Sequence, residues 1–286
     1  MSRSTASRSS PATRFRALIP LICWALLGCL SFAFTDRAQA QASPWAQGEK
    51  SQARLLAAGG LEKGRYLAGV QIKLAPNTLT YWKLPGDAGV PPVFSFEGSI
   101  NVKAMQALYP APRRYAEASG EAFGYRDEVL FPLLVTPVDP ARPVSLALKL
   151  DYATCEKICI PAQAMLHLDL APGARASELA GLIGDWLART PRPPGDPAAP
   201  RPVLSPAEKT NAWHVRFEGT APADLFAEGP DDWFFDTKRA ADGFDLILAQ
   251  KPADAPAGRV EVILTMVMGA RAFEARTPLD VERPKP

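Results

Sequence analysis

Hydrophobic and polar residues alternate along much of this chain with a period of two, the spacing of a β-strand with one buried face. The clearest rows are Val129–Val135, Leu146–Leu150 and Leu166–Leu170. Proline, glycine and aspartate separate the rows, as is typical of short antiparallel strands joined by turns. We therefore predict an all-β fold built as a sandwich.

One segment departs from this pattern and predicts a helix. Its apolar residues recur at helical spacing, at Leu179, Leu182, Ile183, Trp186 and Leu187. Ser177 precedes this stripe. It is the expected N-cap, since a serine hydroxyl can accept a hydrogen bond from the first helical turn.

The longest interruption is a proline-rich segment, residues 190–206, which contains seven prolines. Proline fixes φ and lacks a backbone donor, so we predict a stiff, extended linker here. Alternating rows resume after it, for example in Trp213–Phe217. We therefore expect a first domain over residues 43–189 and a second, smaller β-rich domain over residues 207–286.

The first forty residues have the features of a secretory signal peptide. Arginines precede an apolar run from Ala17 to Phe34, and a small-x-small motif ends at Ala40, where we expect cleavage. A membrane anchor is the alternative, but the run is borderline against the about 20 apolar residues of a spanning helix. Lipid attachment at Cys29 is less favoured because apolar residues follow it directly. We expect an exported, periplasmic protein.

Charge and cysteine content narrow the possible functions. The formal net charge is +2, which gives no indication of a nucleic-acid partner. Two of the four cysteines lie in the predicted signal peptide, so Cys155 and Cys159 are the thiols that remain after export. Disulfides form and persist in the periplasm, so these two cysteines are the candidate functional residues.

Cys155 and Cys159 lie between two leucine rows, which predict the two strands of one hairpin. Residues that face each other in an antiparallel pair are about 4.5–5.5 Å apart, close enough for a disulfide. A permanent structural disulfide is one interpretation. Closing a loop of about five residues stabilises a protein by only about 2 kcal/mol, however, so an exchangeable bond at the hairpin tip is the other.

A metal site is a third interpretation of the two thiols. A tetrahedral zinc or copper site needs further ligands, for which His167 and His214 are the candidates. His167 shares the polar face of a predicted strand, and His214 lies beyond the linker, so neither has the usual ligand spacing to the cysteines. We therefore expect neither a metal nor a cofactor.

The segment around the cysteines, "DYATCEKICIP", resembles the active-site hairpin of the amino-terminal domain of the thiol:disulfide interchange protein DsbD family. The likeness is greatest to the branch that includes the suppressor-of-copper-sensitivity proteins (ScsB). It extends through "YWKLPGDAGVPPVF", "LYPAPRR" and "GYRDEVLFPLLVTP", over roughly residues 43–170. Beyond the linker, "DLFAEGPDDWFF" also resembles the corresponding region of that branch.

This resemblance implies an immunoglobulin-like β-sandwich whose cysteine pair carries electrons outside the inner membrane. Cys155 and Cys159 match the family's redox pair. They would be the catalytic residues of a thiol:disulfide oxidoreductase of the protein-disulfide reductase type. Family members shield the pair with an aromatic cap loop, for which the candidates here are Tyr115, Phe123 and Tyr125.

The implied partners are a membrane-embedded thiol reductase as electron donor and oxidised periplasmic thioredoxin-like proteins as acceptors. This chain places three residues between its cysteines, as in the copper-sensitivity branch and unlike the wider spacing of the best-known members. It also lacks the family's membrane and thioredoxin-like domains, so we expect a separate donor. A non-catalytic binding module with a structural disulfide and a copper-tolerance or metal-handling protein are the alternatives.

Overall fold

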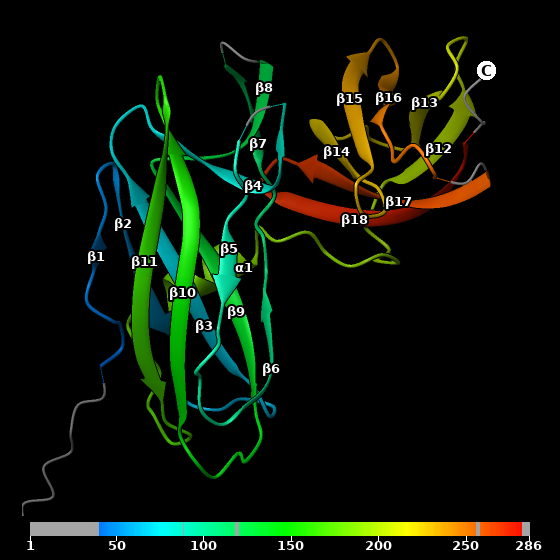
Figure 1. The fold of residues 1–286 in the computed structure, drawn as a ribbon. Helices are drawn as coiled ribbons and strands as arrows, with labels where there is room; N and C mark the ends of the chain where they lie inside the picture. Colours follow the sequence, from blue (N-terminus) through cyan, green and yellow to red (C-terminus); the bar gives the residue numbers. More distant parts are fainter. Residues whose placement is uncertain (1–39, 88, 118–119, 256–257, 282–286) are drawn as a thin grey trace, which may run out of the picture. The chain divides into compact units, whose positions relative to one another are not determined.

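The computed structural model describes residues 40–87, 89–117, 120–255 and 258–281 (Figure 1). Within these ranges the chain forms eighteen β-strands and one α-helix, which confirms the all-β prediction. The predicted signal peptide up to residue 39, with Cys29 and the apolar run, lies outside the described residues. In the described part, no helix has the length and apolar character needed to cross a bilayer.

The first half of the described chain is a sandwich of two sheets. The five-stranded sheet has the order β1 (Ala46–Gln47), β2 (Ser51–Ala57), β3 (Tyr66–Leu74), β9 (Glu128–Pro137), β6 (Val102–Ala107). The six-stranded sheet has the order β11 (Cys159–Leu170), β10 (Val144–Cys155), β4 (Leu79–Gly86), β8 (Gly120–Arg126), β7 (Arg113–Glu117), with β5 (Val93–Ser95) paired to β10. Their inner faces share one apolar core, to which the predicted rows contribute Phe131, Leu148 and Leu168.

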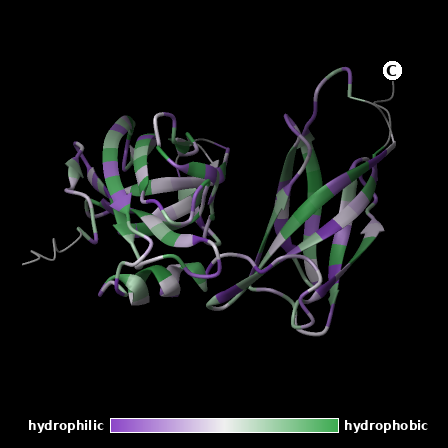
Figure 2. Cartoon of the chain, turned by 90° about the horizontal axis from the view of Figure 1, so that it is seen from below, coloured by the Kyte–Doolittle hydropathy of each residue, from purple (hydrophilic) through white to green (hydrophobic). Residues whose placement is uncertain are grey.

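The leucine rows form the stem of the long β10–β11 hairpin, as predicted (Figure 1). Leu146 lies opposite Leu168 and Leu148 opposite Leu166, and all four are buried. Hydrophobic and hydrophilic bands alternate along such strands in Figure 2. Each buried leucine contributes about 1.5–3 kcal/mol, so the stem is stabilised by more than a disulfide at its tip can add.

A glycine on β8 allows that strand to approach β4 closely. A Cβ atom at Gly124 would lie 2.1 Å from the carbonyl oxygen of Thr80, nearer than any side chain can pack. Tyr81 pairs with Gly124, and the Thr80 hydroxyl donates to the Ala153 carbonyl at 2.9 Å. β4 is thereby held between β8 and the end of β10 that carries Cys155.

The second half of the described chain forms two further antiparallel sheets. One has the order β12 (Arg201–Pro206), β13 (Ala212–Glu218), β16 (Gly243–Gln250), β15 (Phe234–Ala240); the other has the order β14 (Asp224–Glu228), β17 (Gly258–Met268), β18 (Arg271–Val281). Their apolar faces meet in a separate core that includes Val215, Leu246 and Leu264. The smaller β-rich part predicted after the first sandwich is therefore present.

The helix and the proline-rich segment differ in detail from the prediction. Helix α1 spans Ala180–Leu187 with Leu179 at its N-cap, and no side chain caps it. Ser177 lies two residues earlier, where its hydroxyl accepts the Leu179 N–H at 3.0 Å. The last six residues of the predicted linker form β12. Prolines are tolerated there because β12 is an edge strand, whose outward backbone groups need no strand partner.

Candidate redox site at the hairpin tip

Cys155 and Cys159 form a disulfide at the tip of the β10–β11 hairpin. They are the last residue pair in the register of the two strands, and their Cα atoms are 4.2 Å apart. Three residues, 156–158, turn the chain between them. The leucine stem therefore brings the two sulfurs together, as the sequence predicted.

The two cysteines differ strongly in exposure. Cys155 is 8% exposed and packs in a small apolar cluster with Leu79, Tyr81 and Ala122. Cys159, on the other strand, is exposed to solvent. Exchange requires a thiolate to reach a sulfur atom, so Cys159 is the accessible end of this bond.

Tyr81 is the side chain that bonds to the disulfide. Its hydroxyl oxygen lies 3.0 Å from Cys159 Sγ, although the tyrosine itself is buried. Burial, with a smaller effect of Glu117, raises the pKa of Tyr81, so the phenol stays protonated and remains a donor. A Cβ atom at Gly89 would lie 2.4 Å from the Tyr81 ring, so this glycine lets the chain after β4 pack on it.

Of the three aromatics proposed for the cap, Tyr115 lies against the apolar cluster around Cys155. It is half-buried and packs against the cluster that contains Cys155 and Tyr81. The Arg126 guanidinium lies 4.5 Å from the centre of its ring and also pairs with Glu117 at 3.3 Å. Burial raises the pKa of the Tyr115 phenol above its ordinary value.

The other two cap candidates lie elsewhere. Tyr125 is buried in the core of the first sandwich, where its hydroxyl donates to the Pro110 carbonyl at 2.7 Å. Phe123 packs edge-to-face on Phe226 of β14, with ring centres 4.9 Å apart. Residues 118–119 of the predicted cap loop are outside the described residues. Within the described part of that loop, Tyr115 is therefore the candidate in contact with the redox cluster.

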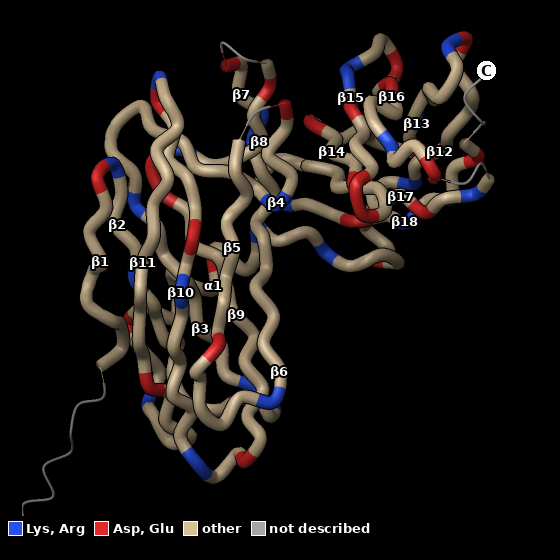
Figure 3. The backbone as a smooth tube through the Cα atoms, in the orientation of Figure 1, with Lys and Arg blue, Asp and Glu red and all other residues tan. Residues whose placement is uncertain are grey.

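The hairpin tip combines charged and apolar surface. Glu156 and Lys157 place opposite charges at the tip (Figure 3), and Glu156 pairs with Lys50 at 3.2 Å. Ile158, next to Cys159, is 72% exposed. A shallow apolar cavity of about 300 Å³ lies along the same hairpin, lined by residues that include Val90, Val93, Tyr152 and Pro161.

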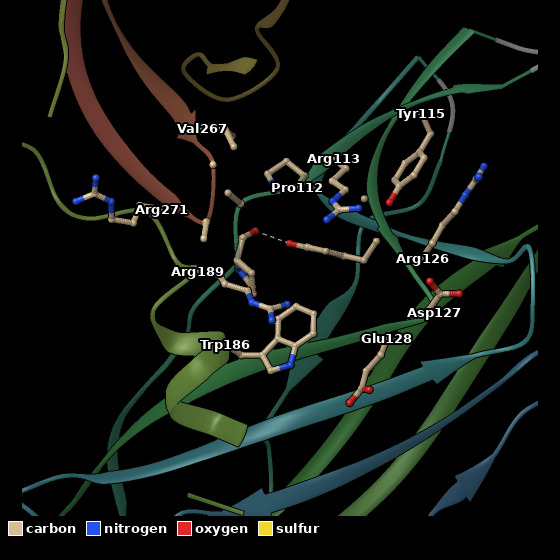
Figure 4. Close-up of a pocket in the computed structure, with 16 residues that line it drawn as sticks. Pro112, Arg113, Tyr115, Arg126, Asp127, Glu128, Trp186, Arg189, Val267 and Arg271 are labelled. Carbon is tan, nitrogen blue, oxygen red and sulfur yellow. Dashed lines mark hydrogen bonds between the residues drawn. The ribbon is translucent and has the colours of Figure 1, made fainter. Parts of the chain in front are cut away.

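A larger cavity, of about 480 Å³, borders Tyr115 (Figure 4). Arg113 and Arg126 contribute to its lining from β7 and β8, and Arg189 lies over the Trp186 ring with its guanidinium 4.3 Å from the ring centre. Tyr125 and Pro110, which form the hydrogen bond described above, also line this cavity. Tyr115 thus contacts both this cavity and the cluster around Cys155.

The two histidines considered as metal ligands lie away from the cysteines. His167 is on β11, where it contacts Ser145 and Asp169. His214 is on β13 and pairs with Asp245 on β16. Among the described residues, no group of three or more histidine, cysteine, aspartate or glutamate side chains is arranged to hold a metal ion.

Sequence reasoning assigned no role to Tyr81. The alternation of Leu79 and Tyr81 along "TLTYW" indicates that these two residues share one strand face. Which face that is depends on the pairing of β4 with β8 and β10, and this pairing joins residues far apart in the chain. The contact between Tyr81 and Cys159 spans 78 residues.

Comparisons with known proteins agree with this geometry. Residues 50–171 match the family model described as the N-terminal domain of the thiol:disulfide interchange protein DsbD. That range contains both cysteines, Tyr81 and Tyr115. The comparison with curated protein sequences found no match.

Among the solved structures, the chain resembles the N-terminal periplasmic domain of ScsB from Proteus mirabilis, with a TM-score of 0.64. The two sequences are 19% identical, and the match covers 85% of this chain and 99% of that one. At this identity the match supports the fold alone. The fold is the predicted one, an immunoglobulin-like sandwich followed by a smaller β-rich part.

Proposed function

Because residues 50–171 form a domain of the DsbD N-terminal family, we propose that this protein relays electrons in the periplasm through Cys155 and Cys159. A disulfide in a domain of this family fits thiol–disulfide interchange in general. The more specific proposal is a cycle in which the pair is reduced by one protein and oxidised by another. The observation that carries it is one exposed cysteine bonded to one buried cysteine at a hairpin tip.

Reduction of the pair begins at Cys159. A thiolate of the donor attacks Cys159 Sγ, forms a mixed disulfide with it and breaks the bond to Cys155, which leaves as a thiolate. The donor's second thiolate then attacks the donor sulfur of the mixed disulfide. Cys159 is released, both cysteines are reduced, and the donor carries the new disulfide. Two electrons have moved from the donor to this protein.

The second half-reaction runs in the opposite direction. The Cys159 thiolate attacks an oxidised acceptor, and Cys155 then attacks Cys159 Sγ, which closes the original disulfide and frees the reduced acceptor. Tyr81 is placed to donate a hydrogen bond to the Cys159 thiolate in this step. Tyr115 is the proposed cap residue, since it packs on the cluster that holds Cys155.

The surface around Cys159 supports a protein partner rather than a small molecule. The adjacent Ile158 and the apolar cavity along the hairpin offer exposed hydrophobic area that a protein partner could cover. We propose a membrane-embedded thiol reductase as the donor and oxidised periplasmic thioredoxin-like proteins as acceptors. The signal peptide would direct export and be cleaved after Ala40.

Trapping of the mixed disulfide tests this proposal. Replacement of Cys155 by serine removes the resolving thiol, so partners are expected to accumulate on Cys159 and to appear as a thiol-sensitive adduct in periplasmic extracts. Cys159→Ser is the matched control and is expected to trap far less, because Cys155 is buried. Absence of adducts with both variants would contradict the relay.

A redox titration separates the relay from an inert structural disulfide. The purified protein is equilibrated with glutathione or dithiothreitol buffers and its free thiols are labelled. A relay is expected to titrate near the potentials of thioredoxin-like proteins, which lie between about −120 and −270 mV. Reduction only below about −300 mV would indicate a structural bond and would overturn the proposal.

A further inference from the structure

Two tyrosines contact the cysteine cluster, and each has a sequence neighbour that faces the other way. Tyr81 precedes Trp82 on β4, and Tyr115 follows Arg114 on β7. Adjacent residues of a strand point to opposite faces of the sheet. The side chains of Trp82 and Arg114 therefore project from the face of the sheet opposite to the face that packs on Cys155.

Both of these neighbours contact β14, and Arg114 also contacts β15. The two hydrogens of Arg114 Nη2 are shared among three acceptors: Asp224 Oδ1 at 3.1 Å and the Leu225 carbonyl at 3.1 Å, both on β14, and Thr237 Oγ1 of β15 at 2.9 Å. The Trp82 ring centre lies 5.6 Å from that of Phe226. Next to Trp82, Lys83 forms a 2.7 Å ion pair with Glu228, at the end of β14. These contacts tie the two tyrosine-bearing strands to β14, with Thr237 of β15 adding a further contact.

Phe226 is the centre of this contact. It is buried and belongs to the apolar core of the first sandwich, although it comes from β14. Its ring packs on Phe123, the residue opposite Arg114 in the β7–β8 pairing. The Arg114 guanidinium lies 5.2 Å from the Phe226 ring centre and 4.7 Å from that of Phe123. Arg114 is therefore fixed by both charge and aromatic stacking.

We propose that β14 braces the redox site, and that Asp224 and Arg114 are positioning residues for thiol exchange at Cys159. The proposal rests on the proposed function and gives the second β-rich part a role in it. Among the described residues, β7 is the edge of its sheet and pairs with β8 alone, where Arg114 also forms an ion pair with Glu121 at 2.5 Å. The contacts of Arg114 with β14 add a second support for β7, and with it for Tyr115, from outside the sheet.

The brace predicts that weakening a contact remote from the disulfide changes how fast the disulfide reacts. When Arg114 loses Asp224, the β7–β8 hairpin is expected to separate more readily from the cluster, so that Cys155, the buried end of the disulfide, becomes accessible in addition to the exposed Cys159. The equilibrium potential of the pair should stay the same, because Tyr81 still bonds to Cys159. Rate and potential are therefore expected to respond differently.

The experiment compares Asp224→Ala with Asp280→Ala in the full exported chain. Asp280 pairs with Arg259 on the surface of β17 and β18, so its loss controls for removal of an ion pair. Reduction by a water-soluble phosphine is followed by maleimide labelling of the free thiols. Asp224→Ala is expected to react about tenfold faster, equivalent to about 1.4 kcal/mol, and Asp280→Ala at the wild-type rate. Equal rates in all three proteins would overturn the brace.

A double variant tests whether the effect passes through Tyr115. Tyr115→Ala alone is expected to accelerate reduction, and the Tyr115→Ala/Asp224→Ala protein should react no faster than Tyr115→Ala. If the two accelerations multiply, Asp224 acts independently of Tyr115 and the proposal is wrong. Arg114→Lys keeps the charge but loses the forked geometry, and it provides the same measurement should Asp224→Ala fail to fold.

This test can fail separately from the proposed function. The phosphine reports access to the sulfurs and needs no protein partner. A disulfide that traps no partner, but that reacts faster in Asp224→Ala, would contradict the relay and retain the brace. A disulfide that traps partners, with equal phosphine rates in wild type and Asp224→Ala, would contradict the brace alone.

Discussion

The phenol oxygen of Tyr81 lies 3.0 Å from Cys159 Sγ, across 78 residues of sequence. A hydroxyl at this distance can donate to the sulfur, and the bond strengthens when the sulfur becomes a thiolate. Tyr81 therefore stabilises the reduced form of the pair relative to the disulfide.

Replacing Tyr81 by phenylalanine should make the disulfide harder to reduce. A hydrogen bond to a charged group is worth about 1.5–3 kcal/mol, and about 30 mV corresponds to 1.4 kcal/mol for this two-electron couple. We expect the reduction potential to fall by about 30–60 mV and the pKa of the Cys159 thiol to rise, both measured by titration. Tyr66→Phe is the control, since the buried Tyr66 hydroxyl has no hydrogen-bond partner. An equal shift in both variants would contradict a specific role for Tyr81.

The two cysteines should differ in reactivity when each is studied alone. Cys155→Ser leaves the exposed Cys159, and Cys159→Ser leaves Cys155, which is 8% exposed. Iodoacetamide should modify Cys159 about tenfold faster or more, because the thiolate must be reached by the reagent and is disfavoured by burial. Mass spectrometry over time measures the two rates. Comparable rates would show that Cys155 is as accessible as Cys159.

Tyr125 should matter for stability and leave the redox chemistry unchanged. Its hydroxyl is buried and donates to the Pro110 carbonyl, so Tyr125→Phe leaves that acceptor without its partner. We expect a loss of about 1–2 kcal/mol in the free energy of unfolding, measured with urea, and a wild-type rate of disulfide reduction. An increase in that rate would instead give Tyr125 a share in covering the pair.

Glu274 on β18 should limit stability at neutral pH. Burial, with a smaller contribution from Glu228, raises the pKa of this carboxyl above its ordinary value of 4.5, against the opposing effect of Lys83. Between that value and the raised pKa the folded state binds more protons than the unfolded state, so stability falls as pH rises through this window. Ionisation of Glu274 at higher pH therefore costs the folded protein stability.

We expect Glu274→Gln to raise the melting temperature at pH 7 and to leave it unchanged below about pH 4, where both proteins are neutral at this position. Scanning calorimetry at the two pH values measures this difference. Glu261→Gln is a suitable control because Glu261 is exposed and pairs with Arg276 on the surface. A stabilisation of the same size at both pH values would exclude the titration of Glu274 as its cause.

The hairpin and its disulfide followed from the sequence because their contacts are local. The rows Leu146–Leu150 and Leu166–Leu170 have the period of a strand, and the short segment between them sets the register that pairs Cys155 with Cys159. The sandwich followed in the same way from repeated alternation. The period of the hydrophobic pattern and the short separation of the paired strands along the chain were sufficient to predict these features.

The side chains around the disulfide could not be predicted from the sequence, because their positions depend on the register between strands that are far apart in the chain. Phe123 and Tyr125 are two residues apart and must share a strand face, but the sequence does not indicate which face meets the cysteines. The structure pairs Tyr115 with Ala122, and this register places Tyr115 on the cysteine side. The contact between Arg114 and Asp224 spans 110 residues and joins two separate sheets, beyond any pattern in one sequence.

The pairing of β10 with β11 continues without interruption from Val144 and Leu170 to the two cysteines. The buried leucines keep the two strands paired whether or not the sulfurs are bonded, so reduction of the disulfide leaves the two thiols next to each other. The second thiol then meets a captured protein at a very high effective concentration and expels it quickly. This hairpin therefore favours fast resolution of the mixed disulfide over a long-lived covalent complex with the partner protein.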